Sequence, residues 1–337
     1  EAATIAIDSV SGGGASESGS QSVAVTITEN ESEPTVTLAT SATSIAENAG
    51  SSLTLTATLS GATDQNVTVV LGTSGTSTEG TDYTDGSGAV DDITITAGST
   101  TGTVSFTPTD DSIYEGNETA IIAISSVTGE ASESGTQAVT ITITDNESAP
   151  TVTLTTSATS IAENAGSSLT LTATLSGATN ADVTVALSTS GAATEGTDYT
   201  DGSGNIDDIV ISAGSTTGTV SFTPSDDSVY EDDEAATIAI SSVSGGSATE
   251  SGTQTVTITI TDNESAGSVT LAVSASSIAE NAGSSLTLTA TLSSVSDEDV
   301  TVSLSTSGTA TEGTDYTDGS GNIDDITISA GDTTGTV

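Results

Sequence analysis

The sequence contains no lysine, arginine or histidine, and it also lacks cysteine, methionine and tryptophan. Its 47 acidic residues give a formal charge of −47 over 337 residues, so no salt bridge between side chains is possible. Because the ionised side chains all repel one another, the compensating cations must come from solution. Nucleic acid and anionic membrane surfaces are not expected as partners, since no basic side chain is present to contact a phosphate.

The missing residue types also argue against most chemistry. Without cysteine there are no disulfides and no thiolate metal ligands. Without histidine, cysteine or lysine, the many serines and threonines have no activating partner for nucleophilic catalysis. A pair of carboxylates that cleaves sugars is also not expected, because such sites usually include aromatic platforms and the sequence has no tryptophan. No apolar run approaches the roughly 20 residues that cross a bilayer, and a targeting segment is expected to lie outside the sequence. We therefore expect no enzymatic activity, no catalytic residue, no organic cofactor and no direct membrane insertion.

Regular alternation is what the sequence does contain. Within 150–265, apolar residues alternate with Thr and Ser in the segments TVTLTTSA, SLTLTATLS, VTVALSTS, DIVISAG, GTVSFTP, ATIAISSV and QTVTITITD. Seven such segments separated by Gly, Asp, Asn and Ser turns predict an all-β fold: a seven-stranded antiparallel sandwich of Ig-like, Greek-key type. With two Phe and five Tyr in the chain, the core must be thin and aliphatic, and a bound ligand is expected to supply part of the stability.

The same sandwich is expected several times in a linear array. SIAENAGSSLTLTATLS occurs at 44–60, 160–176 and 277–293, with offsets of 116 and 117 residues, which fits one sandwich per period. We predict complete repeats at 34–148 and 149–265, a C-terminal part of a repeat at 1–33 and an N-terminal part at 266–337. The chain is expected to be a three-period window of a longer array, its partial repeats completed by continuing chain or by a neighbouring molecule.

Acidic residues recur at fixed places in each period. In the first complete repeat they follow the first strand (Glu47), precede a tyrosine (Asp82), crowd into TDDSIYEGNE at 109–118, and end the last strand at 145–147. We expect these loops to converge at one end of the sandwich. Such a cage of carboxylates would raise its own pKa values or repel itself apart unless a hard divalent cation is bound, and Ca2+ suits flexible carboxylates better than Mg2+.

These motifs together resemble the Calx-beta domain, the regulatory sandwich of sodium–calcium exchangers that also occurs in integrin beta-4 and bacterial surface proteins. The resemblance is carried by ENAG, TEGTDY, GTVSFTP, DDS[IV]YExxE and the closing TITDNE. It implies a calcium cluster held in the first complete repeat by Glu47, Asp82, Asp110, Asp111, Glu115, Glu118, Asp145 and Glu147. In the second it implies Glu163, Asp198, Asp226, Asp227, Glu231, Glu234, Asp262 and Glu264.

Some features depart from the family pattern or leave alternatives open. The closing triplet is Asp-Asn-Glu instead of all-Asp, which predicts fewer ions per cluster. DGSGNIDD, at 201–208 and 318–325, is either an extra metal site or a solvated hairpin. The main cluster could instead be a solvated acidic surface of the kind found in proteins adapted to high salt, although the identical spacing in each period favours a cage. Tyr83, Tyr199 and Tyr316 are expected beside the cage, with wet hydroxyls.

The predicted function is mechanical. The linkers NESEP and NESAP leave little room for hinge motion, so Ca2+ at the domain ends would stiffen the array as the stalk of a bacterial adhesin, an extracellular fibre or a biofilm matrix filament. The predicted location is extracellular or at the cell surface, and the predicted partners are calcium ions and neighbouring repeats. Two alternatives stay open: calcium-sensor domains of a membrane transporter or receptor, and lateral assembly of identical chains in a fibre.

Overall fold

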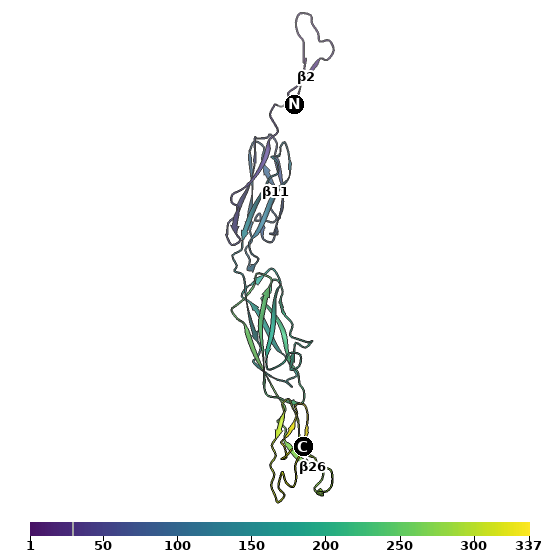
Figure 1. The fold of residues 1–337 in the computed structure, drawn as a ribbon. Helices are drawn as coiled ribbons and strands as arrows, with labels where there is room; N and C mark the ends of the chain where they lie inside the picture. Colours follow the sequence, from purple (N-terminus) through teal and green to yellow (C-terminus); the bar gives the residue numbers. More distant parts are fainter. Residues whose placement is uncertain (29) are drawn as a thin grey trace. The chain divides into compact units, whose positions relative to one another are not determined.

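The computed structural model describes residues 1–28 and 30–337, and every regular element in them is a β-strand (Figure 1). None of the described segments is a helix that could cross a lipid bilayer. The chain divides into two compact units. The first comprises residues 1–111 and 117–146, and the second comprises residues 112–116 and 147–337.

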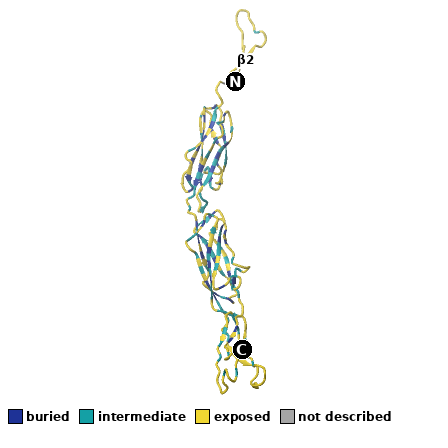
Figure 2. Ribbon diagram, in the orientation of Figure 1, coloured by how far each residue is buried: buried dark blue, intermediate teal, exposed yellow. Residues whose placement is uncertain are grey.

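The first unit contains a terminal hairpin and the first complete sandwich. Its strands are β1 (Ala2–Ala6), β2 (Ser22–Thr26), β3 (Thr35–Thr40), β4 (Ser44–Ala46), β5 (Leu53–Leu59), β6 (Val67–Gly75), β7 (Tyr83–Thr84), β8 (Ile93–Ile95), β9 (Thr101–Pro108), β11 (Glu118–Thr128), β12 (Ser132–Glu133) and β13 (Ala138–Thr144). The sandwich has two five-stranded sheets, in the orders β4-β13-β11-β6-β8 and β12-β3-β5-β9-β7. All residues of β1 and β2 are exposed (Figure 2).

The second unit contains the second complete sandwich. Its strands are β14 (Thr151–Thr156), β15 (Ser160–Ala162), β16 (Leu169–Leu175), β17 (Ala178–Thr179), β18 (Val183–Gly191), β19 (Tyr199–Thr200), β20 (Ile209–Ile211), β21 (Thr217–Pro224), β22 (Val229–Tyr230), β23 (Glu234–Ser244), β24 (Thr249–Glu250) and β25 (Thr255–Thr261). Its sheets, β19-β21-β16-β14-β24 and β15-β25-β23-β18-β20, repeat the order of the first sandwich.

The third repeat also belongs to the second unit. Its strands are β26 (Val269–Val273), β27 (Leu288–Leu292), β28 (Val295–Ser296), β29 (Val300–Val302), β30 (Ile326–Ile328) and β31 (Thr334–Thr336). They form the sheets β26-β27-β31 and β29-β30. The buried core of this part is small and consists of Ala290, Leu292, Ile326 and Ile328. Two further parallel pairs lie in this unit: β22 with β28, and β10 (Ile113–Tyr114) with β17.

Alternation along each strand creates the cores. In β14 the apolar Val152 and Leu154 are buried and the intervening Thr153 is exposed, because successive side chains of a strand point to opposite faces. The Phe222 and Tyr199 rings stack at a centroid distance of 4.6 Å, and the equivalent pair of the first sandwich does the same. Tyr199 is 0% exposed, so the expectation of a wet hydroxyl is wrong for this tyrosine and for Tyr83, at 1%.

The all-β fold of tandem sandwiches is confirmed, and all seven expected segments of the second repeat are strands. Short additional strands bring each sheet to five. Two of these are parallel edge strands that alternation did not indicate: β15 pairs with β25, and β24 pairs with β14. They consist of three and two residues, too few to show a period.

One glycine of the recurring TGTV segment has a steric role. A Cβ atom at Gly218, in β21, would lie 2.5 Å from the carbonyl oxygen of Val210 in the neighbouring strand β20. The same approach occurs at Gly102 and Gly335. The two sheets therefore meet closely at this point, and only glycine fits there.

Candidate metal centre

Four chain segments bring the acidic residues of the second repeat to one end of the sandwich. Glu163 follows β15, and Asp198 immediately precedes β19. Residues 226–234 comprise most of the loop between β21 and β23 together with the first residue of β23, and residues 262–264 follow β25. The parallel pairing of β15 with β25, in which Ala162 lies opposite Thr261, makes both strands end at the same edge. The convergence that the sequence predicts therefore has a direct structural cause in this short parallel pair.

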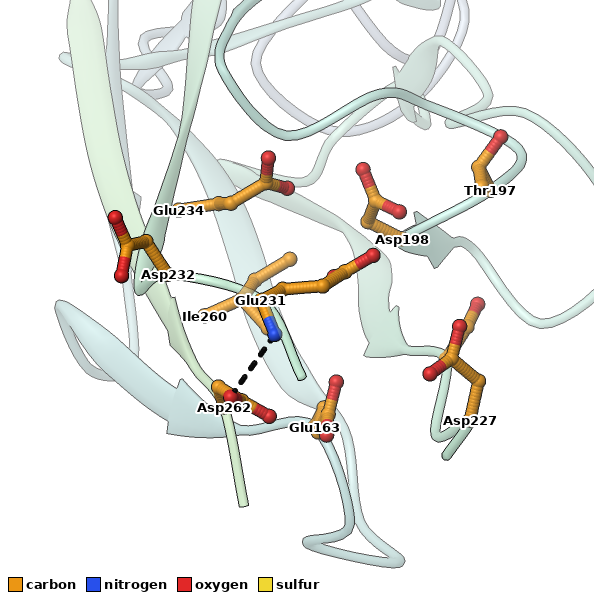
Figure 3. Close-up of a pocket in the computed structure, with 10 residues that line it drawn as sticks. Glu163, Thr197, Asp198, Asp227, Glu231, Asp232, Glu234, Ile260 and Asp262 are labelled. Atoms are coloured by element: carbon orange, nitrogen blue, oxygen red, sulfur yellow. Dashed lines mark hydrogen bonds between the residues drawn. The ribbon is translucent and has the colours of Figure 1, made fainter. Parts of the chain in front are cut away.

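The carboxylates form two triads. Glu163, Asp226 and Glu264 each offer an oxygen within 4.8 Å of the others, and so do Asp198, Glu231 and Glu234. Asp227 and Asp262 line one pocket with Glu163 and the second triad. Six of the eight residues that the sequence predicts for this repeat thus line one acidic pocket (Figure 3), and Asp226 and Glu264 each have a carboxylate oxygen within 4.8 Å of one of Glu163.

Glu163 is the most deeply buried of these carboxylates. It is 5% exposed, and its Oε1 accepts a hydrogen bond of 3.3 Å from the backbone N–H of Asn263. Burial, followed by contact with the Glu264 carboxylate, raises the pKa of Glu163 to about 8. Oε2 of Glu264 is itself buried and has no hydrogen-bond partner. A solvated acidic surface does not explain these two groups, because a buried carboxylate oxygen without a donor is costly.

The second triad is electrostatically similar. Burial and then the Asp198 carboxylate raise the pKa of Glu234 to about 7. Burial and then Asp227 raise the pKa of Glu231. In Figure 3 the side chains of Glu231 and Glu234 lie toward Asp198, whereas Asp232 points away from it. Like charges that lie this close favour either bound protons or a bound cation.

Asp262 holds the loops in place. Its Oδ2 accepts the backbone N–H of Glu231 at 3.1 Å, and its Oδ1 accepts that of Glu264 at 2.9 Å. Asp233 accepts the backbone N–H of Asp262 at 3.2 Å, an interaction that sequence reasoning missed. A sequence signal for this hydrogen bond exists, because both repeats have a side-chain oxygen at this position. In the first repeat, Asn117 accepts the backbone N–H of Asp145 in the same way. Asp262 thus links the loop of residues 226–234 to the end of β25.

The first sandwich repeats part of this arrangement within its own unit. Glu47 is 7% exposed and accepts the backbone N–H of Asn146 at 3.2 Å. Carboxylate oxygens of Glu47 and Asp145 lie within 4.8 Å of each other, as do those of Asp82 and Glu118. The other predicted members are placed as follows: Asp110 lines a pocket with Glu47, Asp111 belongs to the first unit, and Glu115 and Glu147 fall in the ranges of the second unit.

The DGSGNIDD segment is a capped turn. In the second repeat, Oδ1 of Asp201 accepts hydrogen bonds from the backbone N–H groups of Ser203, at 2.7 Å, and Gly204, at 3.0 Å, and from the Ser203 hydroxyl. These hydrogen bonds lower the pKa of Asp201, with the Ser203 amide as the largest cause. The carboxylate therefore stabilises its own loop, in agreement with the hairpin alternative.

The donor set at the acidic pocket fits a hard divalent cation. It offers six carboxylates in two triads, two further aspartates, and the hydroxyl-bearing Thr197 and Ser225 of the pocket lining, which the sequence did not single out. Oxygen ligands in this number suit Ca2+, which takes six to eight of them, and no cationic side chain competes for them. The residues that would hold the ion are therefore Glu163, Asp226 and Glu264, and Asp198, Glu231 and Glu234.

Comparison with known proteins gives one family. The sequence model of the Calx-beta domain matches residues 29–147, 145–264 and 262–334. No curated protein matches the sequence. Among solved structures, CBD12 from CALX1.2 is 16% identical over 66% of this chain and 99% of its own, with a TM-score of 0.29. Invasin, a bacterial integrin-binding protein, is 18% identical over 90% and 54%, with a TM-score of 0.34, and the Yersinia pseudotuberculosis adhesin InvE is 14% identical over 69% and 64%, with a TM-score of 0.32.

Proposed function

The chain belongs to the Calx-beta domain family, and from this premise we propose that it is a non-enzymatic array of repeats in which Ca2+ binding at the sandwich ends stiffens the junctions. One observation carries the proposal. The loop of residues 226–234 supplies three carboxylates to the triads, and the same loop contains β22, which pairs in parallel with β28 of the following repeat. A cation held by this loop is therefore directly connected to the junction.

The residues around the acidic pocket have different roles in the proposed site. Asp262 accepts the backbone N–H groups of Glu231 and Glu264, so it positions the backbone of one residue in each triad. Glu163 supplies a ligand from inside the sandwich, which ties the site to β15. A bound Ca2+ supplies the positive charge that the sequence lacks, and it favours the ionised form of every carboxylate in the pocket. Without bound Ca2+, repulsion among the pocket carboxylates loosens the loop of residues 226–234, and this in turn weakens the β22–β28 pair.

The setting that we propose is extracellular or at the cell surface. Multi-carboxylate sites of extracellular modules bind Ca2+ with dissociation constants of about 10⁻⁴–10⁻³ M, which matches free calcium outside cells. Near-identical tandem repeats are typical of stalks, fibres and matrix filaments, because each copy repeats the same structural unit. We therefore propose that the array is the shaft of a surface adhesin or of a secreted filament.

Calorimetric titration of the full chain with calcium chloride tests the binding part of this proposal. We expect saturable binding with a dissociation constant at or below about 1 mM, and much weaker binding of magnesium chloride, because Mg2+ demands octahedral geometry and gives up its water reluctantly. The substitution Glu163→Gln should remove or weaken binding at one repeat only. Heat that shows no saturation with calcium up to about 10 mM, roughly ten times the weak limit for such modules, would refute the proposal.

A further inference from the structure

The short parallel pair between the second and third repeats has a defined register. Val229 lies opposite Val295, and Tyr230 lies opposite Ser296. The backbone N–H of Asp297 then donates to the carbonyl oxygen of Tyr230 at 3.3 Å. The following repeat therefore contacts the acidic loop at the residue that immediately precedes Glu231.

One further step of this register, which the hydrogen bond from the Asp297 N–H to Tyr230 supports, would place Asp297 opposite Glu231. In a parallel pair, opposite residues lie on neighbouring strands about 4.8 Å apart, and their side chains point to the same face. Glu231 is a member of the second triad, and its backbone N–H is already held by Asp262 at 3.1 Å. The backbone of an acidic residue of the third repeat is thereby brought next to the segment that carries a carboxylate of the second triad.

The electrostatics of the pocket agree with this position. After burial and the Asp227 and Asp198 carboxylates, Asp297 is a further cause of the raised pKa of Glu231, and it also contributes to that of Glu234. Its neighbour Asp299 behaves differently, since its Oδ1 accepts the backbone N–H of Ala330 at 2.8 Å within its own repeat. Of the two aspartates of the SDED segment at 296–299, Asp299 thus caps its own repeat, whereas the charge of Asp297 acts on the glutamates of the second triad.

We propose that Asp297 is an additional acidic member of the second repeat's cation site, so that this site is complete only when the following repeat is docked. This inference rests on the proposed calcium-binding function and names the residue that couples binding to the junction. Like charges opposite each other on neighbouring strands are destabilising, and a cation shared between them reverses that effect. Binding and docking therefore favour each other, as linkage requires.

The preceding junction has a different residue at the equivalent place. Asn180 occupies the position of Asp297, and its backbone N–H donates to the carbonyl oxygen of Tyr114 at 3.3 Å, in the same way that Asp297 contacts Tyr230. β10 and β17 repeat the register of β22 and β28. The backbone contact is thus common to both junctions, whereas the carboxylate is present at one of them.

The test is calorimetric titration of calcium chloride into the full chain carrying Asp297→Asn, which keeps the backbone N–H and the side-chain shape and removes only the charge. We expect the affinity of one class of site to fall about tenfold, the lower end of the range for residues that support a metal site. Glu298→Gln removes the same charge one residue away and should leave the affinity unchanged.

Hydrogen exchange of residues 295–297 supplies a second readout. Calcium should slow exchange there in the wild type, and this protection should shrink in the Asp297→Asn chain. If the wild type binds calcium but Asp297→Asn binds it equally well, or if Glu298→Gln weakens binding to the same extent, this inference fails while the proposed function stands. If the wild type does not bind calcium, both fail.

Discussion

Replacing the buried Glu163 by glutamine should have opposite effects with and without calcium. The glutamine Oε1 can still accept the backbone N–H of Asn263, and its amide can donate to the Glu264 carboxylate, whose Oε2 is buried without a partner. In chelator the variant should therefore be more stable than the wild type. In calcium the order should reverse, because the variant lacks one ionised ligand.

The size of the gain follows from the raised pKa. A carboxyl group whose folded-state pKa is raised from 4.5 to about 8 loses nothing below pH 4.5 and loses stability as the pH rises toward 8. At pH 7.5, three pH units above the ordinary pKa, the loss is about 4 kcal/mol at 1.36 kcal/mol per unit, as an upper limit. Glu163→Gln removes this loss.

Differential scanning calorimetry of the full chain in chelator, at pH 4.5 and pH 7.5, measures the difference between wild type and variant. The subtraction cancels the titration of the carboxylates that do not interact with Glu163. Glu280 occupies the same motif position in the third repeat and is exposed, so Glu280→Gln is the matched control and should change little. A Glu163→Gln chain that is less stable than the wild type at pH 7.5 in chelator would contradict the assignment of Glu163 as a strained carboxylate.

Three further outcomes are expected. Calcium affinity should fall by more than about tenfold between pH 8 and pH 6, because protons compete with the ion for Glu163 and Glu234, whose pKa values are raised to about 8 and 7. Calorimetric titration in buffers of different ionisation enthalpy should show proton release on calcium binding, and an affinity that does not change with pH would contradict this. Phe222→Ala, which empties a fully buried site against Tyr199, should destabilise the second sandwich by about 3–5 kcal/mol in urea unfolding, and a loss below about 1 kcal/mol would argue against the stacked core. Asp201→Ala should reduce hydrogen-exchange protection of its turn and leave calcium stoichiometry unchanged, whereas a lost ion would restore the metal-site alternative.

The sequence predicted the sandwiches and the acidic pocket because both depend on patterns that repeat. Alternation over seven segments indicates which residues face the core, and this holds from Val152 to Ile260, which are 0% and 5% exposed. Fixed spacing of Glu163, Asp198 and Glu264 predicted their convergence, and the parallel β15–β25 pair explains it for Glu163 and Glu264.

The junction could not be predicted in the same way. β22 and β28 have two residues each, and a two-residue strand has no period for a sequence to show. Asp297 is one acidic residue among 47, and it differs from the other surface carboxylates only through the register of a neighbouring repeat. The burial of the tyrosine hydroxyls also depends on packing, because Tyr199 is covered once it stacks on Phe222.

Small-angle X-ray scattering of the full chain, in calcium and after chelation at constant ionic strength, tests the central claim most directly. If cation binding stiffens the junctions, calcium should lengthen the maximum dimension and extend the distribution of intramolecular distances to larger values, and chelator should shorten both. Glu163→Gln should respond less than the wild type, and Glu280→Gln should respond equally. Scattering curves that superimpose with and without calcium, in a chain shown by calorimetry to bind the ion, would contradict the claim.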